Sequence, residues 1–240
     1  LVFYIMLSAF LFSLNAFPIS AGSTELTVEA SVGRLETTPE LPADTPQAGW
    51  AATYGGFNYD WAASIQQTKD GGYIAAGYFT SYFVSSFGSE VGGLWVLKLR
   101  PDGTVEWQKA YGGVGAESIQ QTSDGGFIVA GKARSFGAEG EEIHHLWVLK
   151  LRPNGTIEWQ NNYGGVDYDR SNSIRQTTDG GYIVAGYTKS FGAGKSDLWV
   201  LKLRPDGTIE WQKTYGGADG DEAESIRQTT DGGYVVTGYT

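Results

Sequence analysis

Short apolar segments of strand length alternate with glycine-rich turns along the chain from residue 50 onward. One unit reads Ser-Ile-Arg-Gln-Thr from Ser173, then the turn Asp179-Gly180-Gly181, the apolar run Tyr-Ile-Val-Ala-Gly-Tyr-Thr and a loop. It continues with Leu-Trp-Val-Leu-Lys-Leu-Arg, the turn Pro205-Asp206-Gly207 and Thr-Ile-Glu-Trp-Gln-Lys. Runs of this length between turn residues predict four strands, because glycine supplies the positive φ that tight hairpins need. The first two strands form one hairpin, and the last two form another.

This unit recurs along the chain. Tyr-Gly-Gly begins at Tyr54, Tyr111, Tyr163 and Tyr215, and Asp-Gly-Gly begins at Asp70, Asp124, Asp179 and Asp231. The segment Leu-Trp-Val-Leu-Lys-Leu-Arg-Pro begins at Leu94, Leu146 and Leu198, in steps of 52 residues. A fixed period of this size is typical of solenoids and propellers.

The second and third strands of each unit are apolar on both faces, so their sheet must be covered on both sides. No helical pattern is present, which leaves neighbouring copies of the same sheet as the cover. We therefore predict an all-β fold, a β-propeller of four-stranded antiparallel blades of about 52 residues, with a β-solenoid as the alternative. Residues 50–240 are expected to hold a lone fourth strand at 50–54, three full blades and a partial blade at 225–240. The ring is therefore expected to be incomplete in this chain.

The predicted hairpins also suggest a role for a repeated charge pair. If Arg100 and Thr104 flank the turn between the third and fourth strands, Lys98 stands opposite Glu106. The same arithmetic pairs Lys150 with Glu158 and Lys202 with Glu210. Opposite charges across a strand pair stabilise a sheet, so we assign these residues to structure rather than to a site.

The segment Leu-Trp-Val-Leu-Lys-Leu-Arg-Pro-Asp-Gly-Thr-Ile-Glu-Trp resembles the third and fourth strands of the quinoprotein-dehydrogenase-like (PQQ-repeat-like) propellers. It also resembles tandem-repeat β-propellers of secreted prokaryotic proteins, and the resemblance covers residues 50–240. It implies that Trp107, Trp159 and Trp211 dock one blade against the next. Some members of the superfamily stack their quinone on adjacent cysteines, but this chain has no cysteine, so we expect no quinone cofactor.

The N-terminal residues read as export and linker segments. Residues 1–17 are almost wholly apolar and uncharged, and a small residue, Ala21, stands where a signal peptidase would cut. We predict a signal peptide at residues 1–21; a membrane anchor is the alternative, although Ser8, Ser13 and Asn15 interrupt the apolar run. Residues 22–49 are acidic, contain three prolines and show no apolar period, which predicts a flexible linker.

Charge narrows the choice of partners. The formal net charge is −10, with a pI near 4.7. Nucleic acids and anionic lipids attract clustered Lys and Arg, so we expect no nucleic-acid partner and, after signal cleavage, no membrane association. The absence of cysteine rules out thiolate nucleophiles, disulfides and cysteine-ligated metals.

Candidate binding residues fall on one rim of the predicted blades. The hairpin turns on one rim are nearly identical, whereas the loops on the other rim vary in length and composition. Because loops concentrate function, we expect recognition on the variable rim. Its candidate ligand-binding residues are Tyr59, Asp60, Trp61, Tyr168 and Asp169, and their aromatic rings and carboxylates suit an extracellular protein or a carbohydrate.

A second acidic group on the same rim raises the question of a metal. Asp219, Asp221 and Glu222 offer the oxygen ligands that Ca²⁺ prefers, but their spacing lacks the full pattern of a calcium loop. Solvated acidic turns are the alternative. His144 and His145 are adjacent in a predicted strand, point to opposite faces, and should not share one ion.

Two further repeated features receive structural interpretations. Ser-Phe-Gly begins at Ser86, Ser135 and Ser190 and is interpreted as a loop anchor rather than as a nucleophile. Glutamines on the first strands, such as Gln120 and Gln176, should bond to the backbone of the neighbouring blade, although a polar ring of this kind could also bind a ligand.

The function expected from these features is that of a secreted or cell-surface, non-enzymatic interaction or adhesion module. The alternative is a propeller enzyme, either a cofactor-dependent oxidoreductase or a carbohydrate-active hydrolase or lyase, with its catalytic residues in other blades. A purely structural surface-layer role is a third possibility. The near-identical blades favour the non-enzymatic readings.

Overall fold

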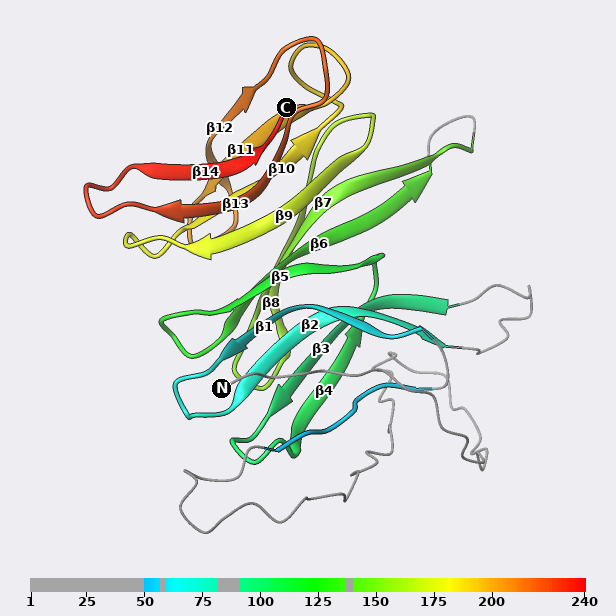
Figure 1. Cartoon of the computed structure of the whole chain (residues 1–240), viewed down its shortest axis with the longest axis vertical. Helices are drawn as coiled ribbons and strands as arrows, with labels where there is room; N and C mark the ends of the chain where they lie inside the picture. The colour runs from blue at the N-terminus through cyan, green and yellow to red at the C-terminus, as the bar shows by residue number, and fades with distance from the viewer. Residues whose placement is uncertain (1–49, 57–58, 82–90, 137–139) are drawn as a thin grey trace, which may run out of the picture.

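The computed structural model describes residues 50–56, 59–81, 91–136 and 140–240, and these residues form an all-β structure (Figure 1). The signal peptide and linker predicted for residues 1–49 lie outside this part of the chain. Sheet 1 contains β1 (Trp61–Gln67), β2 (Tyr73–Ser81), β3 (Val91–Leu99) and β4 (Val105–Tyr111). Sheet 2 contains β5 (Gly115–Gln121), β6 (Phe127–Phe136), β7 (Glu142–Leu151) and β8 (Ile157–Tyr163). Sheet 3 contains β9 (Asp169–Gln176), β10 (Tyr182–Thr188), β11 (Asp197–Leu203) and β12 (Ile209–Tyr215), and sheet 4 contains β13 (Glu222–Gln228) and β14 (Tyr234–Tyr239).

Each four-stranded sheet is an antiparallel meander in sequence order, as the turn pattern predicts. The turn between the third and fourth strands of sheet 1 closes with two backbone hydrogen bonds, Arg100 N–H to Thr104 O at 2.9 Å and Gly103 N–H to Arg100 O at 3.0 Å. Gly103 has a φ of 82°. Glycine adopts this left-handed backbone without steric cost, which explains its place in the turn.

The predicted register of this hairpin is wrong by one residue. Lys98 pairs with Trp107, not with Glu106, because the ladder shifts at a β-bulge between Lys98 and Leu99. The same shift occurs in sheets 2 and 3. A bulge sets two residues of one strand against one of the other, and sequence spacing alone does not reveal it. The ion pair nevertheless forms, with 3.2 Å between Lys98 Nζ and Glu106 Oε2.

The lysine in each hairpin has a second carboxylate partner that the sequence analysis missed. Lys98, Lys150 and Lys202 are each buried, with 3 % of their surface exposed. Lys202 Nζ lies 2.8 Å from Asp179, in the turn between the first two strands, and 3.2 Å from Glu210. In the other two sheets, Asp70 forms the equivalent ion pair with Lys98, and Asp124 forms it with Lys150. Each buried lysine therefore connects the two hairpins of its own sheet.

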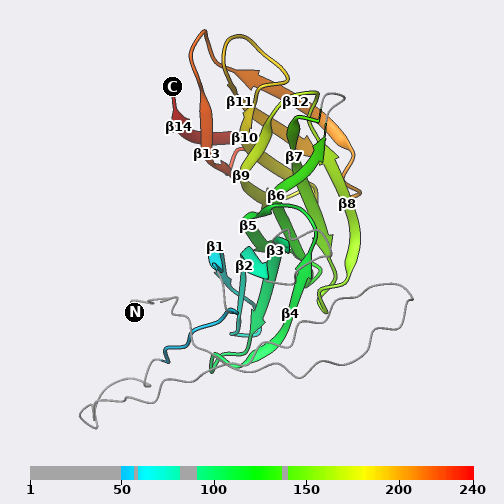
Figure 2. The same cartoon turned by 90° about the vertical axis from the view of Figure 1, so that its right-hand side faces the viewer.

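The sheets pack face to face, which confirms that neighbouring sheets cover the two-sided apolar strands. Ile74 and Val96 of sheet 1 share a core with Phe127 and Leu149 of sheet 2. Equivalent cores join sheet 2 to sheet 3 and sheet 3 to sheet 4. The first strands β1, β5, β9 and β13 contact one another in sequence, whereas the fourth strands β4, β8 and β12 approach less closely. Figure 2 shows the two series along opposite sides of the stack.

Aromatic side chains join successive sheets in a repeated arrangement. The ring centroids of Trp107 and Phe127 are 5.8 Å apart, and Trp159 contacts Tyr182 at the same distance. The hydroxyl of Tyr163 donates a hydrogen bond of 2.5 Å to Gly207 O in the turn of the next sheet. Residues 50–56 contain no assigned strand, yet Trp50 contacts Tyr73 at 5.7 Å in the same way.

The repeated glutamines join the first strands, as predicted. The side-chain oxygen of Gln66 accepts a hydrogen bond from Gln121 N–H at 2.8 Å, and that of Gln120 accepts one from Gln176 N–H at 2.7 Å. Other glutamines accept bonds from the turn of the preceding sheet, as Gln228 does from Thr178 N–H at 2.9 Å. Their amides therefore satisfy the open edges of neighbouring strands.

Candidate ligand-binding rim

The two rims of the stack differ in what they present. One rim carries the uniform Asp-Gly-Gly and Pro-Asp-Gly or Pro-Asn-Gly turns. The other carries the connections from fourth to first strands and from second to third strands, where all the residues predicted to bind a ligand fall. We define the variable rim as this second set of loops with the strand ends that join them.

Two of the predicted ligand-binding residues hold loops instead of facing solvent. Asp60 and Asp169 are both buried. The Asp169 carboxylate accepts hydrogen bonds from Gly165 N–H and Ser190 Oγ, both at 2.8 Å, and from the hydroxyl of Thr188. Asp60 accepts a bond of 2.5 Å from Gly56 N–H. Their carboxylates are therefore taken up by the protein.

The predicted calcium residues point to three different partners. Asp219 is exposed and lies 3.3 Å from Lys195 Nζ, while Asp221 is buried and accepts a hydrogen bond of 2.9 Å from Gly217 N–H. Glu222 is hydrogen-bonded to Tyr239. In the part of the chain that the structure describes, no three His, Asp or Glu side chains gather in a group that could hold a metal ion.

The predicted aromatic residues separate into two places. Tyr59 and Trp61 are exposed on sheet 1, where Trp61 makes an edge contact with Tyr78 at 6.4 Å. Tyr168 belongs to sheet 3, and sheet 2 lies between the two. The structure therefore does not bring these candidates into a single site.

Tyr168 is the centre of an aromatic cluster that crosses from sheet 2 to sheet 3. Its ring stacks on Tyr187, with centroids 6.0 Å apart and planes inclined by 9°, and His144 of β7 lies 4.5 Å away. Lys189 Nζ is 5.9 Å from the Tyr168 ring centroid, a cation–π distance. Burial raises the pKa of Tyr168 and raises that of Tyr187 to about 12, so both hydroxyls are protonated at neutral pH.

Charged side chains border this cluster. The carboxylate of Glu117 on β5 forms two ion pairs, at 3.3 Å with Lys132 Nζ and at 3.0 Å with Arg170 Nη2. Glu142 lies 2.5 Å from His144 Nε2 and 3.3 Å from Arg134 Nε. The hydrogen bond to His144 and the nearby charge of Arg134 hold the pKa of Glu142 below its usual range. Two polar atoms of the cluster, His144 Nδ1 and Arg170 Nε, are buried and have no hydrogen-bond partner among the described residues.

The two adjacent histidines serve different neighbours, as their strand position predicts. His144 faces Tyr168 and Glu142, whereas His145 Nε2 lies 2.7 Å from Ser135 Oγ. A serine–histidine contact resembles part of a catalytic triad, but a triad also needs a group that orients the imidazole and donors for an oxyanion. Ser190, in the same motif of sheet 3, bonds to Asp169 and secures its loop. The Ser-Phe-Gly motif is thus a loop anchor there, as predicted.

Tyr168 is recognisable as a candidate in the sequence, but most of the cluster around it is not. Tyr187 and Arg170 are neighbours across the β9–β10 ladder, while Glu117 and His144 come from sheet 2. Only the packing of one sheet on the next brings them together. The one signal in the sequence was the loss of repetition: Arg170 stands where the first strands of sheets 1, 2 and 4 have Trp61, Gly115 and Glu222.

Comparisons with known proteins assign no family. No protein-family model matches the chain, and no curated protein matches it. Within the described residues, no helix is long and apolar enough to cross a membrane.

Proposed function

We propose that this chain forms part of a β-propeller that is secreted or displayed on the cell surface and that binds an extracellular protein without acting as an enzyme. The Tyr168 cluster on the variable rim carries the proposal. Protein interfaces concentrate their binding energy in a few residues, among which Tyr, Trp and Arg are enriched. Tyr168 and Arg170 are both partly buried at the surface between two sheets.

The radial arrangement is supported by the unequal approach of the strands. The first strands β1, β5, β9 and β13 contact one another, while the fourth strands lie farther apart. Wedges that share an axis on the side of the first strands would have this spacing. In a propeller, sheets are arranged in this way around a central channel, whereas the coils of a solenoid stack in parallel. An experimental structure in which the four first strands do not surround one axis would refute the propeller.

Partner chemistry follows from the residues at the cluster. The carboxylates of Glu117 and Glu142 already form ion pairs, while His144 Nδ1 and Arg170 Nε lack partners in the part of the chain that the structure describes. Buried polar atoms of this kind gain most when an incoming group satisfies them. A protein backbone segment beside an apolar side chain would supply both kinds of group: its carbonyl oxygen can accept from Arg170 Nε–H, and its N–H or carbonyl can meet His144 Nδ1, according to the tautomer of the ring.

The experiment immobilises the purified chain and offers it secreted proteins of the producing cells and, in parallel, a glycan array. We expect a protein that is retained by the unmodified chain and lost with Tyr168→Ala and with Arg170→Ala. Asp102→Ala, which alters an exposed turn on the uniform rim, is the matched control and should retain it. Binding of glycans alone, or protein retention that the rim variants leave unchanged, would refute the proposal.

Export is tested separately. Residues 1–49 fused to a reporter enzyme that is active only outside the cytoplasm should give activity, and deletion of residues 1–21 should abolish it. Equal activity of both fusions would contradict export through this segment.

A further inference from the structure

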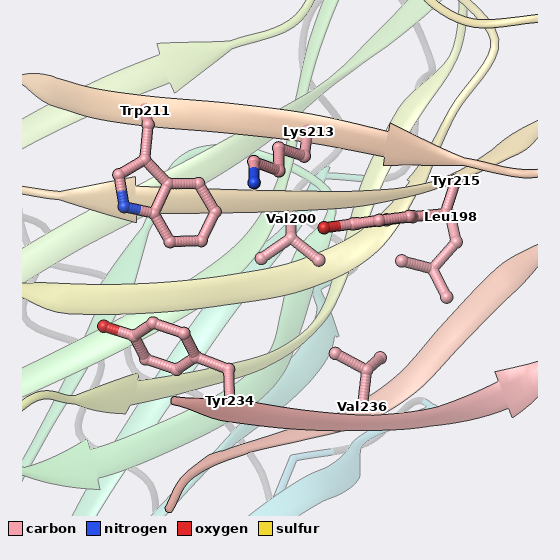
Figure 3. Close-up of a pocket in the computed structure, with 7 residues that line it drawn as sticks. All are labelled: Leu198, Val200, Trp211, Lys213, Tyr215, Tyr234 and Val236. Atoms are coloured by element: carbon pink, nitrogen blue, oxygen red, sulfur yellow. The ribbon is translucent and has the colours of Figure 1, made fainter. Parts of the chain in front are cut away.

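An apolar groove lies on the face of sheet 3 that looks toward sheet 4 (Figure 3). Leu198, Val200, Trp211 and Tyr215 form one side, from β11 and β12, and Tyr234 and Val236 of β14 form the other. Its volume is about 480 Å³. The groove is open because sheet 4 covers β9 and β10 but has, among the described residues, no third and fourth strands to cover β11 and β12.

The same surface is covered wherever a four-stranded sheet follows. Leu146 and Val148, which correspond to Leu198 and Val200, are fully buried against sheet 3. Tyr163 is 7 % exposed, whereas the corresponding Tyr215 is 53 % exposed. The groove is thus the counterpart, on sheet 3, of the surface of sheet 2 that packs against sheet 3.

A Trp and a Tyr of the fourth strand contact the turn of the following sheet at the closed interfaces. Between sheets 1 and 2 only the tyrosine is hydrogen-bonded to it, Tyr111 to Gly155 O at 2.5 Å, and Trp107 Nε1 has no hydrogen-bond partner among the described residues. Between sheets 2 and 3 both side chains donate. Trp159 Nε1 donates to Pro205 O at 3.1 Å, and Tyr163 donates to Gly207 O. A Cβ atom at Gly207 would lie 2.8 Å from the Trp159 ring, so only glycine fits beneath the indole. At the first sheet, Trp50 Nε1 and the Tyr54 hydroxyl donate hydrogen bonds to Pro101 O and Gly103 O in the same way.

In the groove, this pair recurs as Trp211 and Tyr215. Trp211 contacts Tyr234 at 5.8 Å and has Lys213 Nζ at 5.8 Å from its ring centroid. The edge of β14 beside the groove also lacks a partner strand among the described residues, whereas β2, β6 and β10 are each paired on both sides. The groove and the open strand edge lie next to each other.

We propose that this groove binds a β-hairpin that carries the sequence of the chain's own third and fourth strands, as in residues 197–215. The hairpin's first strand would pair with the open edge of β14 by β-strand addition. The residues corresponding to Trp199, Leu201 and Leu203, which face the preceding sheet in sheet 3, would fill the groove. Its Pro-Asp-Gly turn would accept hydrogen bonds from Trp211 and Tyr215.

The test uses the full chain and a fluorescein-labelled synthetic peptide of residues 197–215, with binding followed by anisotropy. We expect saturable binding at one peptide per chain. Val236→Asp should weaken it about tenfold or more, because a carboxylate would be buried without a partner. Val235→Asp changes the neighbouring residue, which alternates to the opposite face of β14, and is the matched control; it should alter affinity less than about twofold.

A second variant reports on the turn itself. Tyr215→Phe should weaken binding about three- to tenfold, the value of one hydrogen bond. No saturable binding, binding that Val236→Asp leaves intact, or a dimer of the chain that hides Tyr215 and excludes the peptide would overturn the proposal.

A covalent extension of the chain tests the same contact in case the free peptide does not fold by itself. The chain is extended after Thr240 by a copy of residues 189–215, and the control extension carries Leu201→Asp in the added copy. The first extension should unfold at a higher temperature than the control, and equal midpoints would overturn the proposal. Neither test depends on ligand binding at the variable rim, so the two proposals can fail separately.

Discussion

Replacing Asp179 with Asn removes one of the two negative charges that neutralise the buried Lys202. The asparagine keeps a side-chain oxygen for Gly181 N–H, which Asp179 binds at 3.0 Å. The turn can therefore persist while the charge is lost. Lys202 would then retain Glu210 at 3.2 Å and the carbonyl oxygen of Leu203 at 3.3 Å.

The expected loss of stability lies between the values for exposed and buried ion pairs. Removing one partner of a buried pair costs about 3–5 kcal/mol, whereas exposed pairs contribute about 0–1 kcal/mol. The Lys202 side chain is 4 % exposed, but that of Asp179 is 57 % exposed and one carboxylate remains. We therefore expect Asp179→Asn to lower the free energy of unfolding by about 2 kcal/mol.

Lys202→Met should be milder, within about 1 kcal/mol, because it removes the buried charge and leaves two carboxylates that water can reach. The double variant should resemble Lys202→Met, which gives a coupling energy of about 2 kcal/mol. Chemical denaturation followed by circular dichroism measures all three. Asp206→Asn is the control, since Asp206 shapes an exposed turn without a lysine. If Asp179→Asn costs no more than this control, or less than Lys202→Met, the reasoning is refuted.

Three further predictions concern pH and the contacts between sheets. Hydrogen bonds from Lys202 and Thr177 hold the pKa of Asp179 at about 2, below the ordinary value of about 3.9, so its stabilisation is present above about pH 4 and is lost toward pH 2. Denaturation midpoints should fall across this range, and Asp179→Asn should flatten the fall; an equal slope would contradict the ion pair. Tyr163→Phe should cost about 1–2 kcal/mol in thermal unfolding, because it leaves Gly207 O with only the long bond of 3.5 Å from Asn161 Nδ2, whereas Tyr239→Phe, at an exposed residue, should cost less than about 0.5 kcal/mol. Gly186→Ala should cost more than about 3 kcal/mol, since its Cβ would lie 1.9 Å from Arg170 O; a soluble variant of unchanged stability would contradict that packing.

The sequence was sufficient for the strands because their signals are local. Alternation of apolar runs with Asp-Gly-Gly and Pro-Asp-Gly turns predicts the hairpins of all the four-stranded sheets, and two-sided apolarity predicts that one sheet covers the next. It failed at the register of the third and fourth strands, since the bulge at Lys98 leaves no mark in residue spacing. The sequence also contains no sign that Asp70 is a partner of Lys98. Asp70 lies in the turn between the first two strands, and only the folded sheet brings this turn next to the lysine on the third strand.

Repetition determined the fold class of this protein, whereas the candidate sites depend on how the sheets pack. Asp169 reads as a rim ligand in the sequence, but the structure buries it beneath Ser190 and Thr188. The cluster around Tyr168 and the groove beside Tyr215 both form between sheets, from residues that belong to different repeats. Local sequence specifies strands and turns through backbone preference and burial, but contacts between repeats depend on the angle and spacing of whole sheets. Those quantities are set only when the apolar faces pack together.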